Sequence, residues 1–207
     1  MSQPISYAIS SGEATDQDFE TARIRITDQA KMLAEYRVSY FQIREKRLSA
    51  SNLYRLAEDT VRRLEGSSTR LLINDRADIA AAVGAFGIHL TETSLPAKMV
   101  KQSFGDNLAI FVSTHSSKQI RDAELAGASV AVFGPIFPTP GKSQLAGLEK
   151  LSFAVKETNL PVLALGGVDD ENFYSVMDVG AAGVAGIRIF ADEKSTAKLM
   201  ELVNGYE

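Results

Sequence analysis

Cationic and amide side chains alternate along one short segment, residues 41–46. Gln42, Arg44 and Lys46 occupy every second position there. In an extended segment, alternate residues project to the same side. Two cations beside an amide at the end of a strand are suited to binding a phosphate or pyrophosphate. The alternative is a solvated basic turn, and the position at a predicted strand end favours the anion site.

An amide and a carboxylate follow the next apolar segment, residues 70–74. Asn74 ends that predicted strand and Asp75 comes directly after it. Asp75 is a candidate ligand for magnesium, which prefers hard oxygen ligands and often binds beside substrate phosphates. The alternative is a helix N-cap for the predicted helix 76–83. The two roles can also be divided between Asn74 and Asp75.

Two later strand ends carry hydroxyl and imidazole groups. His89 lies in the predicted strand 87–90, and Ser113 and His115 alternate at the end of the strand 108–113. Ser113 and His115 are therefore expected to face the same side. No Asp or Glu lies close enough in sequence to orient a Ser–His nucleophile, so nucleophilic catalysis is disfavoured. Both histidines are equally consistent with packing positions.

A Pro- and Gly-rich segment, residues 133–143, follows the sixth predicted strand and carries Thr139 and Lys142. Long shaped loops beside a binding site tend to be functional. The alternative is a rigid connector without a role in binding.

Glycines lie at the ends of the last two predicted strands. Gly166 and Gly167 come after the strand 161–165, and Gly186 and Ile187 end the strand 183–187, with Arg188 directly after it. A Gly–Gly pair allows a ligand to approach the backbone closely, and N–H groups at a helix start attract anions. These glycines predict a second anion site, made of backbone groups.

Short β-branched segments alternate with longer segments of helical period, which predicts βα units and a parallel sheet. The predicted strands are 6–10, 40–43, 70–74, 87–90, 108–113, 129–133, 161–165 and 183–187. The predicted helices are 16–36, 49–64, 76–83, 96–103, 116–126, 148–156, 170–179 and 192–203. A Gly-Ala joint begins at Gly84, Gly127 and Gly180, each time between a helix and a strand. The repeated joint, with Gly as a left-handed C-cap, indicates one architecture throughout.

Eight alternating units predict a single (β/α)₈ TIM barrel, an α/β fold, over residues 1–207. The rival is an open doubly wound sheet, which usually has a G-x-G-x-x-G turn after its first strand. Here that position reads Ser10-Ser11-Gly12-Glu13. In a barrel, all the strand ends above meet at one rim, where active sites lie. Two anion sites on that rim predict two phosphorylated substrates and a transferase that expels magnesium pyrophosphate.

Composition excludes several classes of protein. The 207 residues carry a formal net charge of −4 and include no cysteine and two histidines. The mild acidity argues against nucleic-acid binding, and the absence of cysteine excludes disulfides, zinc–thiolate sites and thiol nucleophiles. No signal peptide or membrane-spanning segment is predicted, so a cytoplasmic location is expected. The expected partners are small phosphorylated molecules, and the sequence is compatible with a homodimer.

Seven segments, in order and at matching spacing, resemble the family of thiamine phosphate synthase and its relative thiazole tautomerase. The resemblance extends from about Ser6 to Phe190, and its segments are FQIREK, LLINDR, GAFGIHL, VSTHS, FGPIFPTPGK, LALGGVDDEN and GAAGVAGI. It implies a barrel enzyme that joins a hydroxymethylpyrimidine pyrophosphate to a thiazole phosphate and releases pyrophosphate. It also implies that pyrophosphate leaves first and that the thiazole nitrogen captures the resulting pyrimidine cation.

The resemblance implies a role for each matching residue. Gln42 contacts the pyrimidine, and Asp75 binds magnesium. The pyrophosphate contacts are Arg44, Lys46, Asn74, Ser113 and Lys142. The residues around the thiazole phosphate are Thr139, Gly167, Ile187 and Arg188.

The sequence departs from the synthase pattern at a few positions. Ser94 stands where the synthases carry a second acidic magnesium ligand, and Glu92 is the nearby carboxylate. Gly141 replaces a hydroxyl residue and Arg188 replaces a serine. Pro135 stands where the tautomerases carry a characteristic histidine. Thiazole tautomerase and a non-catalytic phosphate-binding barrel are therefore the alternatives to the synthase.

Overall fold

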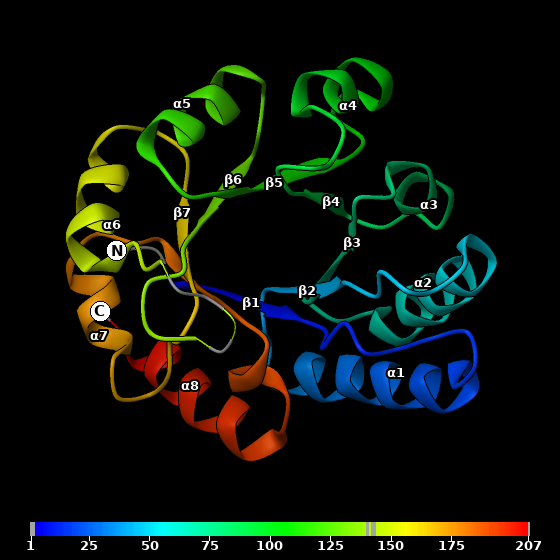
Figure 1. Cartoon of the computed structure of the whole chain (residues 1–207). Coiled ribbons are helices and arrows are strands. Elements are labelled where there is room, and N and C mark those ends of the chain that lie inside the picture. The colour runs from blue at the N-terminus through cyan, green and yellow to red at the C-terminus, as the bar shows by residue number, and fades with distance from the viewer. Residues whose placement is uncertain (1–2, 140, 142–143, 207) are drawn as a thin grey trace.

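The computed structural model describes residues 3–139, 141 and 144–206. Within them, eight parallel strands form a closed barrel in chain order, and helices surround it (Figure 1). The strands are β1 Ile5–Ile9, β2 Tyr40–Ile43, β3 Arg70–Asn74, β4 Gly87–Leu90, β5 Ala109–Thr114, β6 Val130–Phe133, β7 Val162–Leu165 and β8 Gly183–Gly186. The helices are α1 Phe19–Glu35, α2 Ala50–Leu64, α3 Ala77–Ala82, α4 Ala97–Phe104, α5 Ser117–Leu125, α6 Gly147–Lys156, α7 Phe173–Asp178, the 3₁₀ helix η1 Arg188–Phe190 and α8 Glu193–Gly205.

The predicted closed barrel is confirmed, and the open doubly wound sheet is wrong. Strand β1 pairs with β2 on one side and with β8 on the other, with Ile5 opposite Gly183. A Cβ atom on Gly183 would lie 2.0 Å from the carbonyl oxygen of Ile5. A glycine at this position therefore permits the close approach of the strands that closes the ring.

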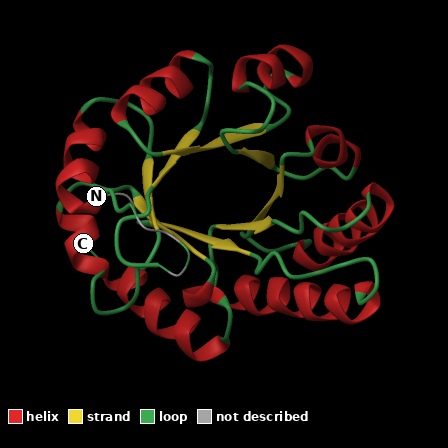
Figure 2. Cartoon of the chain, in the orientation of Figure 1, coloured by secondary structure: helices red, strands yellow, loops and turns green. Residues whose placement is uncertain are grey.

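Alternate residues of each strand divide the core into two layers. One buried cluster fills the barrel interior and includes Tyr7, Leu72, Phe111 and Leu163. A larger cluster lies between the outer barrel surface and the helices. Figure 2 shows these helices outside the ring of strands. The interior positions nearest the carboxyl ends of the strands are where polar side chains reach the mouth of the barrel.

The helix-to-strand joints agree with the prediction. Gly84, Gly127 and Gly180 all have positive φ angles, of 68°, 86° and 94°. This left-handed conformation ends a helix without steric cost for glycine.

Helix α1 begins at Phe19, three residues later than predicted. The Asp16 carboxylate accepts hydrogen bonds from the backbone N–H and hydroxyl of Ser49 and so supports the start of α2 instead. Thr15 forms a parallel bridge with Arg47. Long-range pairing of this segment thus overrides its local helical pattern.

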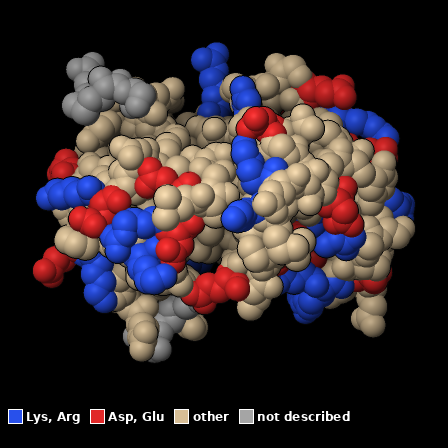
Figure 3. Space-filling view, turned by 90° about the horizontal axis from the view of Figure 1, so that it is seen from above, with Lys and Arg blue, Asp and Glu red and all other residues tan. Residues whose placement is uncertain are grey.

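Charges are mixed on the outer surface. The face seen in Figure 3 shows Lys and Arg interspersed with Asp and Glu, without a broad area of one sign. Surface ion pairs such as Arg62–Glu58 and Lys118–Asp122 account for part of this mixing. In the part of the chain that the structure describes, no helix has the length and apolar character needed to cross a membrane.

Candidate active site

The barrel interior near the mouth contains a group of buried polar side chains. Tyr7, Gln42, Asn74 and His89 are buried, and Ser113 lies beside them. These residues come from the five consecutive strands β1 to β5. The parallel register places their inward positions side by side although the residues are far apart in sequence.

Hydrogen bonds connect these side chains across the barrel interior. The Tyr7 hydroxyl lies 3.1 Å from Gln42 Oε1 and 3.0 Å from His89 Nδ1. The second ring nitrogen of His89, Nε2, lies 2.7 Å from Ser113 Oγ. Buried polar groups are costly unless they are paired, so this pairing holds the four side chains in fixed orientations.

The same chain continues to the carboxylate of Asp75. Gln42 Nε2 donates to Asn74 Oδ1 at 3.0 Å, and Asn74 Nδ2 donates to Asp75 Oδ2 at 2.7 Å. Ser94 Oγ donates to the other carboxylate oxygen. Asp75 has a φ angle of 61°, unusual for a residue other than glycine. Such backbone strain clusters at functional sites.

Asp75 does not cap helix α3. The N-cap residue is Arg76, which makes no side-chain capping hydrogen bond. The helix-cap alternative for Asn74 and Asp75 is therefore wrong, and both side chains belong to the polar group at the mouth.

Burial controls the protonation of two members of the chain. Desolvation lowers the pKa of His89 from 6.5 to about 4, with Asp75 opposing this shift and Arg44 and Lys46 adding to it. Burial also raises the pKa of the Tyr7 hydroxyl well above 10.0. His89 is thus neutral and Tyr7 keeps its proton at pH 7.

Arg44 and Lys46 lie on the β2–α2 loop at this rim. In the described part of the chain, none of the ion pairs involves either residue. The backbone N–H of Arg44 donates to Ser10 Oγ at 2.8 Å. A Cβ atom on Gly12 would lie 3.0 Å from Arg44 Nη1, so the guanidinium lies over the β1–α1 loop. Within the part of the chain that the structure describes, both cations are therefore left without an internal ion-pair partner.

Glu45, between the two cations, fixes this arrangement. It is 3% exposed, and its carboxylate accepts the backbone N–H groups of Gly12 at 3.1 Å and Ala14 at 2.8 Å. The β1–α1 loop is thereby attached to the loop that carries Arg44 and Lys46.

The loop after β6 packs on the glycines after β7. The backbone N–H of Phe137 donates to the Gly166 carbonyl at 2.9 Å. Cβ atoms at Gly166 and Gly167 would lie 3.4 Å from Thr139 Oγ1 and 2.7 Å from Phe137 Cβ, respectively. Thr139 is therefore brought against Gly166. Lys142 lies outside the described residues.

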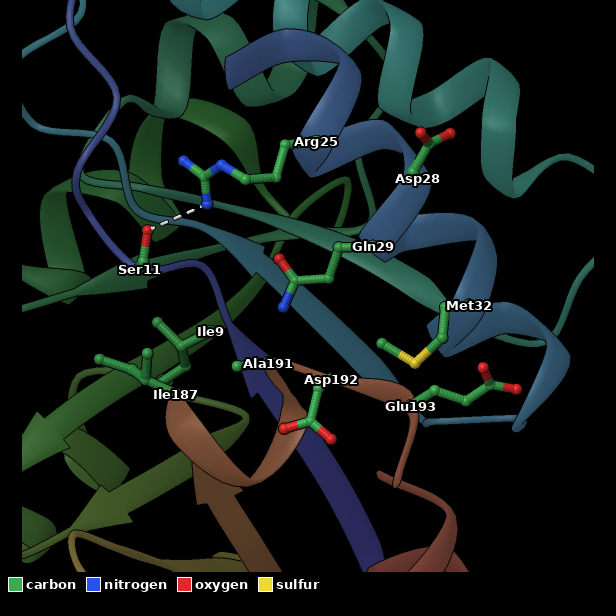
Figure 4. Close-up of a pocket in the computed structure, with 10 residues that line it drawn as sticks. All are labelled: Ile9, Ser11, Arg25, Asp28, Gln29, Met32, Ile187, Ala191, Asp192 and Glu193. Atoms are coloured by element: carbon green, nitrogen blue, oxygen red, sulfur yellow. Dashed lines mark hydrogen bonds between the residues drawn. The ribbon is translucent and has the colours of Figure 1, made fainter. Parts of the chain in front are cut away.

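Ile187 lines a cavity of about 240 Å³ between β1, α1 and the β8–α8 junction. Figure 4 shows Ile9 and Ile187 side by side, with Arg25 directed toward Ser11 from α1. Arg188 is exposed at the start of η1. The cavity beside Ile187 is thus lined by both apolar and charged side chains.

A second hollow of about 450 Å³ lies on the other side of the mouth, between the β4–α4 loop and α5. Ser94 and Ser113 line it together with Glu92. Glu92 accepts a hydrogen bond from Gln119 Nε2 at 2.6 Å and not from Ser94. The Glu92 carboxylate is therefore hydrogen-bonded to α5, on the outer side of the barrel.

Sequence reasoning missed Tyr7 and Glu45, and it placed His89 equally among packing residues. Tyr7 and His89 meet across 82 residues of sequence, which only the barrel register brings together. The available signal was the alternation of side chains along each strand, which places Tyr7 and His89 at inward-facing positions of the predicted strands. His115 lies apart from Ser113, since its Nδ1 bonds the Gly134 carbonyl.

The residues present fit a magnesium ion held by a single protein carboxylate. Among the described residues no group of three or more His, Cys, Asp or Glu side chains converges. Magnesium commonly binds one or two carboxylates and takes its other ligands from substrate phosphates and water. Asp75, half-buried at the rim that also carries Arg44 and Lys46, matches this donor set.

The fold and the rim define a class, a TIM barrel with polar and cationic side chains at the mouth where such barrels have their active sites. The family model described as thiamine monophosphate synthase matches residues 9–190. The chain belongs to that family.

Individual relatives of the chain carry names of the same family. A putative thiamine-phosphate synthase of Geobacter sulfurreducens is 42% identical over 147 residues, which cover 70% of this chain and 69% of the relative. A thiamine-phosphate synthase of Clostridium tetani is 30% identical over 93% of this chain and 92% of its own length. The solved thiamine phosphate pyrophosphorylase of Pyrococcus furiosus matches with a TM-score of 0.83 at 26% identity, covering 98% of this chain and 96% of that one.

Proposed function

We propose that the protein is a thiamine-phosphate synthase, a transferase that joins hydroxymethylpyrimidine pyrophosphate to thiazole phosphate. The observation that carries the proposal is that Arg44, Lys46 and Asp75 all lie near enough to the buried His89 to shift its pKa. Neither cation has an ion-pair partner among the described residues. Family membership and the names of the relatives support the same activity.

The bond changes balance without a further reactant. The bond between the pyrimidine methylene carbon and the pyrophosphate oxygen breaks, and its electron pair leaves with pyrophosphate. The lone pair of the thiazole nitrogen then forms the new carbon–nitrogen bond to the pyrimidine cation. Stabilising the charge that develops on the leaving group is the main task of the site.

The residues divide this task by position. Arg44, Lys46 and Lys142 bind the pyrophosphate, and Asn74 and Ser113 help to place the same substrate. Gln42 contacts the pyrimidine. The backbone of Gly166 and Gly167, with Thr139, Ile187 and Arg188, holds the thiazole phosphate. Magnesium at Asp75 supplies charge neutralisation of the departing pyrophosphate.

The proposal also covers the setting of the enzyme. We place it in the cytoplasm as a single barrel domain over residues 1–207, possessing small-molecule partners and no nucleic-acid partner. A homodimer is the assembly that we would test first.

The test is incubation of the purified protein with both substrates and magnesium, with release of pyrophosphate and formation of thiamine phosphate as the two measurements. Reactions that lack one substrate or contain excess chelator are the controls. Formation of both products supports the synthase. If thiazole phosphate binds but no pyrophosphate is released, the synthase proposal fails, and turnover of thiazole tautomers then distinguishes the isomerase from a binding protein.

A further inference from the structure

The hydrogen-bond chain inside the barrel has a defined direction, which starts from the Asp75 carboxylate. Both oxygens of this carboxylate accept hydrogen bonds, one from Asn74 Nδ2 and the other from Ser94 Oγ. The Asn74 amide must therefore present its NH₂ group to Asp75, and it does so at 2.7 Å. The Asn74 oxygen then faces Gln42 and accepts from Gln42 Nε2 at 3.0 Å.

The orientation of the Asn74 amide determines the orientation of the next two groups in the chain, Gln42 and Tyr7. With its NH₂ group directed at Asn74, Gln42 presents Oε1 to the Tyr7 hydroxyl at 3.1 Å. Tyr7 has a single proton and donates it there. The contact of 3.0 Å between Tyr7 Oη and His89 Nδ1 is then a hydrogen bond only if Nδ1 carries a proton and donates it.

The last step fixes the Ser113 proton. A neutral imidazole carries one N–H, so protonation at Nδ1 leaves Nε2 as an acceptor. Ser113 Oγ, at 2.7 Å from Nε2, is the donor to it. Every bond in the chain is satisfied by this single arrangement, in agreement with the absence of unpaired buried side-chain N or O atoms among the described residues.

We propose that Tyr7 and His89 are positioning residues. The Tyr7 hydroxyl holds the His89 ring as the Nδ1–H tautomer and fixes the Gln42 amide, and the His89 ring in turn directs the Ser113 proton into the barrel. The role in substrate binding rests on the proposed function, whereas the tautomer does not.

The first experiment measures the tautomer directly. The ¹⁵N resonances of His89 are recorded between pH 6 and 8 in the full chain, and a His115→Gln variant assigns the two histidines. The expected result is a protonated Nδ1 and an unprotonated Nε2. A protonated Nε2, or a ring protonated on both nitrogens, overturns the proposal.

The second experiment separates positioning from general packing. Tyr7→Phe removes the hydroxyl from the chain. Tyr40→Phe is the matched control. The Tyr40 ring packs edge-on against the Tyr7 ring, with 6.2 Å between the ring centroids, and the Tyr40 hydroxyl makes no hydrogen bond to the described residues. We expect Tyr7→Phe to raise KM for the pyrimidine substrate by about tenfold, the loss expected for one hydrogen bond.

The KM for thiazole phosphate should stay within about twofold in both variants, since no member of the chain is expected to touch that substrate. An equal rise in both KM values, or an equal effect of Tyr40→Phe, overturns the positioning role. If Tyr7→Phe does not fold, the tautomer measurement on the native chain still decides the proposal. If the native chain has no synthase activity, the proposed function fails while the tautomer result stands on its own.

Discussion

At the residue scale, Lys46 is an exposed cation at the rim without an ion-pair partner among the described residues. We expect Lys46→Ala to lower kcat/KM by at least ~10², because it removes a charge contact to the leaving pyrophosphate. Steady-state kinetics with both substrates measure this loss. Lys31→Ala is the control, since Lys31 pairs with Glu35 on the outer face of α1. Equal activity in the two variants would show that Lys46 does not bind the leaving group.

His89 gives the folded protein a defined pH dependence. Its pKa is about 4 in the fold and 6.5 in the unfolded chain, so the unfolded state binds more protons between these values. Stability therefore rises with pH across this range and is lost as the pH falls from about 6.5 to about 4. The contribution amounts to at most about 3 kcal/mol.

Urea unfolding at several pH values tests this expectation. The His89→Gln variant should lose less stability than the native chain between pH 7 and pH 4, because it lacks the buried imidazole. His115→Gln should retain the full native dependence if His89 is its source. Parallel curves for the native chain and His89→Gln would contradict the assignment.

The predictability of single residues from the sequence depends on how local their pattern is. Gln42, Arg44 and Lys46 were identifiable because their alternation is visible within five residues. Tyr7 was not, because its partners Gln42 and His89 lie 35 and 82 residues away. Only the parallel register, which no short segment encodes, brings these groups together.

At the element scale, the β6–α6 and β7–α7 loops depend on one glycine. Gly167 has a φ angle of 67°, and a Cβ atom there would lie 2.8 Å from the Pro138 carbonyl oxygen. Gly84 has a nearly equal φ angle of 68° with no atom within 4 Å of such a Cβ atom. A comparison of alanine substitutions at Gly84 and Gly167 therefore separates the cost of backbone strain from the cost of a clash between the loops.

We expect Gly84→Ala to cost about 1–2 kcal/mol of unfolding free energy from the left-handed backbone alone. Gly167→Ala should cost about 1–3 kcal/mol more, because the loops must separate. It should also raise KM for thiazole phosphate, whereas Gly84→Ala should not. Urea unfolding and kinetics provide the measurements. Equal costs and unchanged KM in both variants would show that the loop contact does not shape this site.

The elements themselves were predicted well where hydrophobic periodicity decided them. All eight strands lie within one residue of the predicted bounds at each end. The predicted start of α1 was wrong because the Asp16 carboxylate accepts a hydrogen bond from the backbone N–H of Ser49, at the start of α2. The 3₁₀ helix η1, which contains Arg188, was not foreseen, since its three residues carry no periodicity.

At the scale of the whole molecule, the two proposed anion sites belong to different strands of one ring. Arg44 and Lys46 follow β2, whereas Gly166 and Gly167 follow β7. Ligands that bind separate sites stabilise the native state independently. Each ligand at 100 times its Kd should therefore add about 2.7 kcal/mol of unfolding free energy.

Chemical unfolding with magnesium pyrophosphate, with thiazole phosphate and with both together tests this separation. We expect the two increments to add within about 0.5 kcal/mol. A combined effect no larger than the greater single one would mean that the ligands compete for one site.

The closure of β1 onto β8 also affects how copies of this chain can meet. Each of the eight strands has a hydrogen-bonded neighbour on both sides, so the sheet has no free backbone edge within the described residues. Free edges are the surfaces through which sheets recruit further strands and aggregate. Any self-association of the intact barrel must therefore proceed through the outer helices and loops, and a lasting cross-strand pairing between copies would first require the ring to open.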